Sequence, residues 1–132
     1  CVWPDQPDRF RRLRSAIAIA RAEPPELIVG DAVTTIAPAL APLAEIAHPV
    51  VTNTWVLNYL DGPSRTAYVA ALDQIGAEQD LSWVFAESPA LTPELPWEQE
   101  PADPHLTVTT LVRWRSGQRT VEPLATSHPH AY

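Results

Sequence analysis

Three short apolar runs, separated by helical segments, constrain the fold of this chain more than any other feature. The first run, residues 27–29, stops at Gly30-Asp31, and the others cover residues 50–56 and 81–87. A short apolar run between turn residues predicts a buried strand, and strands that alternate with helices predict a parallel sheet. We therefore expect an α/β protein whose ligand-binding residues lie just beyond the carboxyl ends of its strands.

The segments around these runs complete the predicted fold. Apolar residues recur at helical spacing in three segments, and Pro38 and Pro42 interrupt the second of them. The three predicted helices cover residues 5–22, 33–47 and 63–78. Residues 105–114 and 119–126 flank a short connection that contains Gly117, which predicts a hairpin after an irregular loop. We expect a Rossmann-like mixed sheet of the methyltransferase type, with parallel strands, flanking helices and a C-terminal antiparallel hairpin.

Size and charge exclude several classes of function. A chain of 132 residues forms one α/β domain over residues 1–132, or a fragment of a larger methyltransferase-like domain. The net charge of −7 argues against a nucleic-acid partner, and no apolar run approaches the ~20 residues that cross a bilayer. The single cysteine, Cys1, makes no internal disulfide, and a cytoplasmic location is expected. The abundance of alanine, proline and arginine without lysine is typical of a GC-rich, for example actinobacterial, genome.

The beginning of the chain, Val2-Trp3-Pro4, resembles the interior of a longer protein, and we expect an N-terminal truncation. An unfinished sheet exposes strand edges and apolar helix faces, which pair with other chains. Self-association is therefore expected.

Several fragments, in this order and spacing, resemble a bacterial family catalogued as domain of unknown function 2332. They are Val2-Trp3-Pro4-Asp5, Arg9, Arg12-Leu13, Gly30-Asp31-Ala32, the segment 51–60 and Trp83-Val84-Phe85-Ala86-Glu87. The resemblance covers nearly the whole chain and implies that it is the carboxyl-terminal part of a longer protein. It also implies a Rossmann-type, methyltransferase-like sheet. The glycine turn that approaches the cofactor in methyltransferases has no counterpart in this sequence.

Four residues are candidates for contact with S-adenosylmethionine, the cofactor that this fold implies. Asp31, after Gly30, stands where methyltransferase-like proteins place an acidic residue near the adenine amino group. Asn53 offers donors and acceptors at the end of a strand, and Trp55 offers a stacking face. Each has a structural alternative: Asp31 caps a helix, Asn53 is a satisfied strand-end amide, and Trp55 belongs to the core.

Asn58, Tyr59 and Glu87 are candidates for a substrate pocket beside this cofactor site. Glu87 ends the third apolar run, where a carboxylate contacts substrate, acts as a general base, or serves only as a cap or salt-bridge partner. The pair His128 and His130 lacks a third ligand, so we expect no metal.

Two functions remain in competition. In the first, the parent protein is an S-adenosylmethionine-dependent, methyltransferase-like enzyme of unknown substrate, in which methyl transfer depends mainly on holding donor and acceptor in line. In the second, the chain is a non-catalytic, degenerate Rossmann-like module that binds a partner or serves as a scaffold.

Overall fold

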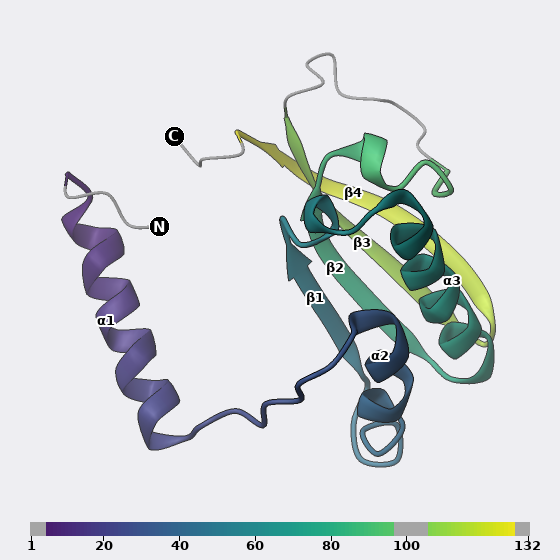
Figure 1. Ribbon diagram of the computed structural model, residues 1–132, viewed down its shortest axis with the longest axis horizontal. Helices are drawn as coiled ribbons and strands as arrows, with labels where there is room; N and C mark the ends of the chain where they lie inside the picture. The colour runs from purple at the N-terminus through teal and green to yellow at the C-terminus, as the bar shows by residue number, and fades with distance from the viewer. Residues whose placement is uncertain (1–4, 97–105, 129–132) are drawn as a thin grey trace.

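The computed structural model describes residues 5–96 and 106–128, and Figure 1 shows their arrangement. A four-stranded sheet in the order β1-β2-β3-β4 forms the body of the chain. The helices are α1 (Pro7–Ala22), α2 (Ala32–Leu40) and α3 (Gly62–Glu78), with short 3-10 turns η1 (Leu57–Tyr59) and η2 (Pro89–Leu91). The strands are β1 (Val50–Thr54), β2 (Leu81–Glu87), β3 (Thr107–Arg115) and β4 (Gln118–Ser127).

The sheet is mixed, as the sequence predicts. β1 pairs in parallel with β2, whereas β2 with β3 and β3 with β4 are antiparallel. The predicted C-terminal hairpin is confirmed: Ser116 and Gly117 both have positive φ, 50° and 74°, as a tight turn matched to the twist of its strands requires. The amide of Ser116 donates to Asp80 Oδ1 at 2.9 Å, which ties this turn to the end of α3.

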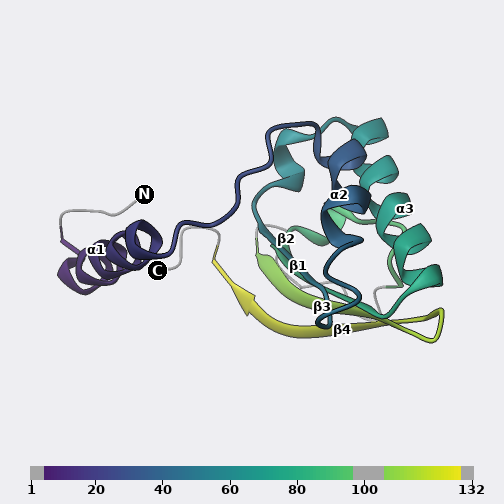
Figure 2. The same ribbon diagram turned by 90° about the horizontal axis from the view of Figure 1, so that it is seen from below.

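α2 and α3 lie side by side on one face of the sheet (Figure 2). The core forms between these helices and the inward side chains of the strands, because successive residues of a strand point to opposite faces. Alternate residues of β2 and β3 therefore supply its largest members. They include Leu81, Trp83, Phe85, Val112 and Trp114, each at most 2% exposed, and Leu72 of α3 packs with them in the core.

The first predicted strand is not present in this structure. Leu27, Ile28 and Val29 belong to no helix or strand, and their exposed fractions are 84%, 58% and 98%. A strand is stable only beside another strand, and in the described part of the chain nothing pairs with this segment. The sheet consequently has one parallel pair of strands instead of the three parallel strands that we expected.

The second predicted helix is shorter than expected. α2 ends at Leu40, and turns occupy the residues up to Ala47. Pro38 lies inside α2, and Pro42, the second residue after its end, lacks the backbone donor that would continue the ladder of hydrogen bonds. The strand predicted over 50–56 likewise stops at Thr54 because Trp55 adopts a positive φ.

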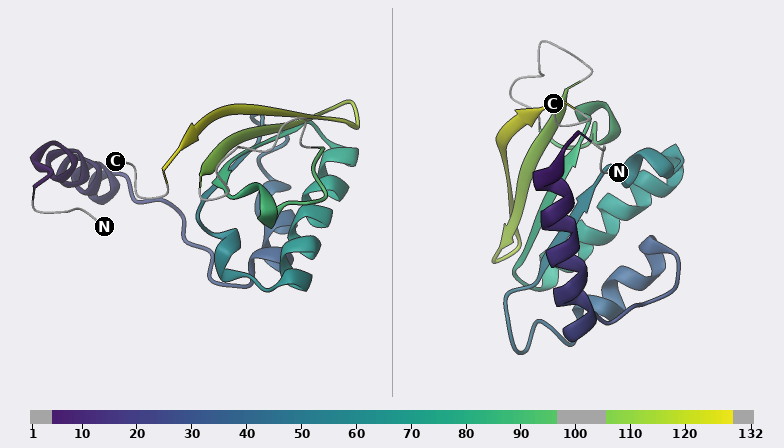
Figure 3. Two further views of the ribbon diagram at one scale, coloured as in Figure 1. Left: turned by 90° about the horizontal axis from the view of Figure 1, so that it is seen from above. Right: turned by 90° about the vertical axis from the view of Figure 1, so that its left-hand side faces the viewer.

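α1 stands apart from the body of the structure. A nine-residue connection, residues 23–31, joins its end to α2 (Figures 1 and 3). None of the residues of α1 is buried. The predicted helix at this place is confirmed, whereas its apolar face lacks a partner in the described part of the chain.

Candidate functional site

A buried carboxylate lies where the parallel strands β1 and β2 end. Glu87, the last residue of β2, is fully buried. Its Oε1 atom accepts hydrogen bonds from Asn53 Nδ2 at 2.8 Å, from the amide of Val56 at 2.7 Å and from the amide of Leu57 at 3.1 Å. Three donors on one oxygen fix the carboxylate in place.

Asn53 joins this carboxylate to the aromatic core. Its Oδ1 accepts a hydrogen bond of 2.6 Å from the indole Nε1 of Trp83, while its Nδ2 donates to Glu87. Trp83 in turn stacks on Phe85, with ring centroids 4.1 Å apart. The interpretation of Asn53 as a satisfied strand-end amide is thus confirmed.

Trp55 turns the chain sharply at the rim beside Glu87. Its φ of 56° is rare for a bulky residue and carries backbone strain. Its amide donates to Ala86 O at 3.1 Å, and its indole Nε1 donates to Thr107 Oγ1 at 3.2 Å. The next two amides are those that Glu87 accepts, so this carboxylate holds the strained turn. Trp55 is 36% exposed, which places it at the rim rather than in the core.

Two buried oxygens near this rim have no hydrogen-bond partner among the described residues. They are Glu87 Oε2 and Thr110 Oγ1. The register places Asn53, Phe85 and Thr110 in one row across β1, β2 and β3. A buried acceptor without a donor costs about 1–3 kcal/mol, more for a charged group, so the orphaned oxygens call for an explanation.

Tyr68 of α3 is the titratable neighbour of this carboxylate. It is 7% exposed and packs edge-on against Trp83, with ring centroids 6.0 Å apart. Burial of the phenol, followed by the negative charge of Glu87, raises the pKa of Tyr68 to about 12. The phenol therefore stays protonated at neutral pH, with its hydroxyl able to donate.

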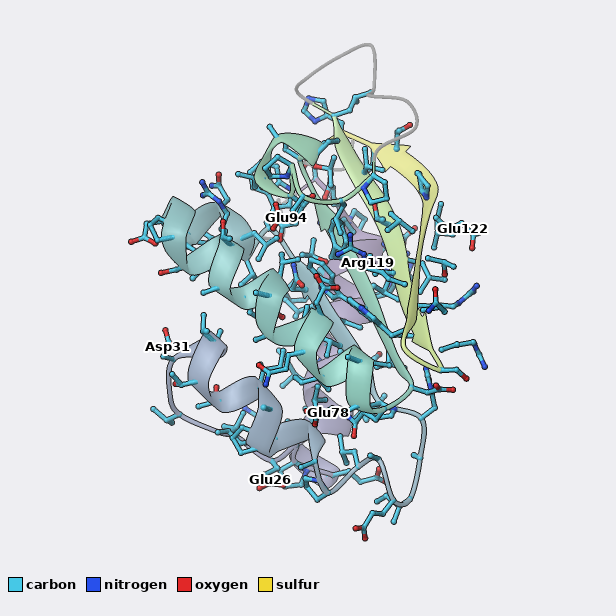
Figure 4. The ribbon with its side chains drawn as sticks, turned by 90° about the vertical axis from the view of Figure 1, so that its right-hand side faces the viewer. Glu26, Asp31, Glu78, Glu94, Arg119 and Glu122 are labelled. Atoms are coloured by element: carbon cyan, nitrogen blue, oxygen red, sulfur yellow. The ribbon has the colours of Figure 1, made fainter. Side chains whose placement is uncertain are left out.

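Asp31 and Gly30 lie outside this network. Asp31 is the N-cap of α2: its Oδ1 accepts from the amides of Val33 at 2.9 Å and Thr34 at 3.1 Å, which confirms the capping interpretation. Figure 4 shows Asp31 at the start of α2. Both capping bonds use Oδ1, so Oδ2 remains available to an outside donor. At Gly30 a Cβ atom would collide with Thr35 Cγ2, so close packing on α2 is a structural reason for this glycine.

Asn58 and Tyr59 belong to η1, immediately after the turn at Trp55. Both are exposed, and the side chain of Tyr59 is 85% exposed. They border the rim on its solvent side and make no hydrogen bond to Glu87. The structure thus brings Asn53, Trp55 and Glu87 together and leaves the other candidates at the margin or beyond.

Sequence reasoning missed the polar parts that Tyr68, Trp83, Thr107 and Thr110 play at this rim. Tyr68 and Trp83 are buried core residues, yet the Glu87 charge acts on the Tyr68 phenol and the Trp83 indole donates to Asn53. The alternation of inward and outward residues in β3 is the one sequence signal for these threonines, and it places Thr110 on the core face. It does not predict the role of Thr107, because the hydrogen bond from Trp55 to Thr107 depends on an unusual turn.

Two general properties limit what the described residues can do. In the ranges 5–96 and 106–128, no cluster of three or more His, Cys, Asp or Glu side chains is placed to hold a metal ion. No helix in these ranges combines the length and the apolarity that crossing a membrane requires. Cys1, His105, His130 and the part of the predicted loop from residue 97 onward lie outside the described residues.

A family model described as an uncharacterized protein conserved in bacteria (DUF2332) matches residues 1–132. The match covers the whole chain, so the chain belongs to this family. No curated protein and no solved structure is significantly similar to it.

Proposed function

We propose that this member of the DUF2332 family binds a small molecule rich in hydrogen-bond donors at the carboxyl rim of β1 and β2, with S-adenosylmethionine as the first candidate. On this proposal the chain is part of a Rossmann-type, methyltransferase-like enzyme. Its sheet offers the common location for such a site, because ligands of α/β sheets bind beyond the carboxyl ends of parallel strands.

The orphaned Oε2 atom of Glu87 is the observation that carries the proposal. A buried carboxylate that uses one oxygen for three protein donors and the other for none is prepared to accept one more donor. Ribose hydroxyls and the amino group of an amino-acid moiety are donors of this kind. Trp55 at the edge of the rim offers an aromatic face to a base or an alkyl chain.

The remaining candidates take supporting roles on this proposal. Asp31 accepts from the adenine amino group through Oδ2 while Oδ1 caps α2. Asn58 and Tyr59 contact the substrate from η1. The bound cofactor would supply the methyl group, and these residues would orient donor and acceptor and keep water out.

The test is calorimetric titration of S-adenosylmethionine and S-adenosylhomocysteine into this chain and into a longer form of the protein. The Glu87→Gln variant should lose affinity by roughly 10-fold to 100-fold, because a hydrogen bond to a charged group contributes about 1.5–3 kcal/mol. Glu122→Gln is the matched control, because Glu122 is an exposed carboxylate on β4. Equal affinity of the wild type and Glu87→Gln for these ligands would show that Glu87 does not contribute to binding.

A second function, a non-catalytic binding or scaffold module, is supported by a different observation. Glu87 Oε1 accepts from the amides of Val56 and Leu57, which stabilises the turn at Trp55, and Asn53 ties Glu87 to Trp83 in the core. On this alternative the network exists to hold that turn. Absence of binding to either form, in protein that is folded by circular dichroism, would favour the scaffold.

A further inference from the structure

α1 presents an apolar face that nothing in the described part of the chain covers. Phe10, Leu13 and Ile17 recur at helical spacing and are 58%, 44% and 44% exposed. Together with Arg14, Ala18 and Arg21 they surround one concave surface of the helix. Removal of such side chains from water is favourable, so a solitary helix of this composition favours association.

A groove of matching character lies between α2 and α3. It measures about 470 Å³, and four of its lining residues on α3, Ala67, Ala70, Gln74 and Glu78, are exposed. Half of its lining residues are alanine, which leaves room for large side chains from another helix. The lining residues are Val33, Ala37, Ala67, Ala70, Ala71, Gln74, Ile75 and Glu78.

The two surfaces match in length and in shape. The concave surface of α1, which combines the apolar face with two arginines, extends from Phe10 to Arg21, and the part of the groove on α3 extends from Ala67 to Glu78. Both spans cover the same number of residues, and at 1.5 Å per residue each is ~16 Å long. Large side chains protrude from α1, whereas small ones line the groove, so ridges of one fit grooves of the other.

The charges of the two surfaces are opposite. Five arginines and Asp8 give α1 a formal charge of +4, in a chain whose total is −7, so all other residues together carry −11. Glu78 is the charged member of the groove lining and stands near the end of α3 (Figure 4). A helix that lies parallel to α3 brings Arg21 beside Glu78 when Phe10 lies beside Ala67.

We propose that α1 of one copy docks in the α2–α3 groove of a second copy, parallel to α3, and that the exchange is mutual. Each groove then receives the partner's α1, which closes a two-fold dimer of the domain-swapped kind. The connection contains Pro24-Pro25, whose fixed φ angles make it a semi-rigid spacer that holds α1 away from its own body. This proposal is independent of the rim site and of any cofactor.

The experiment measures the molar mass of the chain by analytical ultracentrifugation over a range of concentrations. The wild type should be a dimer. Leu13→Asp on α1 and Ala70→Arg in the groove should each raise the dissociation constant at least tenfold. Ser15→Asp and Thr66→Arg are matched controls, because both side chains are exposed on the same two helices but outside the proposed contact. These controls should remain dimeric.

Two further measurements separate the proposal from other modes of association. A mixture of Leu13→Asp and Ala70→Arg should form a heterodimer with one intact contact, the wild-type α1 of the second variant in the wild-type groove of the first. Arg21→Glu and Glu78→Arg should each weaken the dimer, and the double variant should recover it. A monomer at all concentrations, a dimer insensitive to both Leu13→Asp and Ala70→Arg, or no heterodimer in the mixture would overturn the proposal.

Discussion

Gly76 of α3 lies so close to the indole ring of Trp114 on β3 that a Cβ atom at Gly76 would overlap the ring. Trp114 also donates a hydrogen bond of 3.0 Å from its Nε1 to Asp73 Oδ1 on the same helix, so the ring has little freedom to move away from α3. The approach of α3 to the sheet therefore depends on the missing side chain.

Overpacking by Gly76→Ala should by itself cost about 1–3 kcal/mol of the free energy of unfolding, because it forces the helix away from the sheet. The better helix propensity of alanine opposes this by about 1 kcal/mol, which is less than the cost of the overlap. Urea denaturation followed by tryptophan fluorescence measures the difference. Gly62→Ala at the start of α3 is the control, since the nearest atom to a Cβ there is 3.9 Å away. Equal stability of the two variants would contradict the prediction.

Tyr68 should make the protein sensitive to alkali. Its pKa rises from 10.0 to about 12 on folding, because burial and the Glu87 charge disfavour the phenolate. A raised folded-state pKa contributes stability that is complete below pH 10 and is lost as the pH rises toward 12. The loss should reach about 2–3 kcal/mol, given 1.36 kcal/mol per pKa unit. The chain has three tyrosines and no lysine, so few other groups titrate in this range.

The measurement is unfolding in urea at several pH values, with tyrosinate absorbance recorded in parallel. Tyr68→Phe should flatten the alkaline part of the stability profile and remove the late component of the absorbance titration. Tyr59→Phe is the control, because that ring is 85% exposed. If the free energy of unfolding of Tyr68→Phe falls with alkaline pH as steeply as that of the wild type, Tyr68 is not the group responsible.

The two ion pairs of the hairpin should differ in their contribution to stability. Arg119 donates to Asp73 at 2.8 and 3.0 Å, and the same carboxylate accepts the indole of Trp114, so α3, β3 and β4 meet at one half-buried group. Asp73→Ala should cost about 1–3 kcal/mol, because it leaves the indole without a partner. Glu122→Ala, at the exposed 3.5 Å pair with Arg113, should cost less than about 1 kcal/mol. Thermal unfolding of both variants tests the order.

The elements with the clearest local signals were predictable from sequence. β2 begins and ends where its apolar run does, and α3 follows from Asp61, Pro63 and its periodic apolar residues. The segment 27–29 carries an equally clear strand pattern, yet it is not a strand here. Periodicity indicates what a segment prefers, whereas a strand also needs a neighbour, which no local pattern supplies.

The candidate site was predictable in location but not in chemistry. The carboxyl ends of the second and third runs pointed to Asn53, Trp55 and Glu87, and the parallel pairing of β1 and β2 brings them together. The three donors on Glu87 Oε1 depend on the left-handed turn at Trp55. The sequence does not predict this turn, because such a conformation is usually marked by glycine and the residue here is tryptophan. Asp31 followed the same pattern but has its hydrogen bonds within α2.

Asn53→Asp should convert the rim into a pH-dependent pair of carboxyls. The substitution keeps an acceptor for Trp83 but replaces the Nδ2 donor, 2.8 Å from Glu87 Oε1, by an oxygen. Two negative charges at this distance repel, so the free energy of unfolding should fall by roughly 1–3 kcal/mol at neutral pH. One proton shared by the pair restores a donor and removes the repulsion, which raises the folded-state pKa of the pair.

The sign of the pH dependence follows from this raised pKa. Relative to wild type, the variant should lose little stability near pH 4, about the unfolded-state pKa of carboxyl groups, and progressively more as the pH rises through the folded-state pKa. Urea denaturation at about pH 4 and about pH 8 measures the change. Asn58→Asp is the control, because it adds the same charge at an exposed residue of η1. A stability difference between Asn53→Asp and wild type that does not change with pH would show that the two carboxyls do not interact.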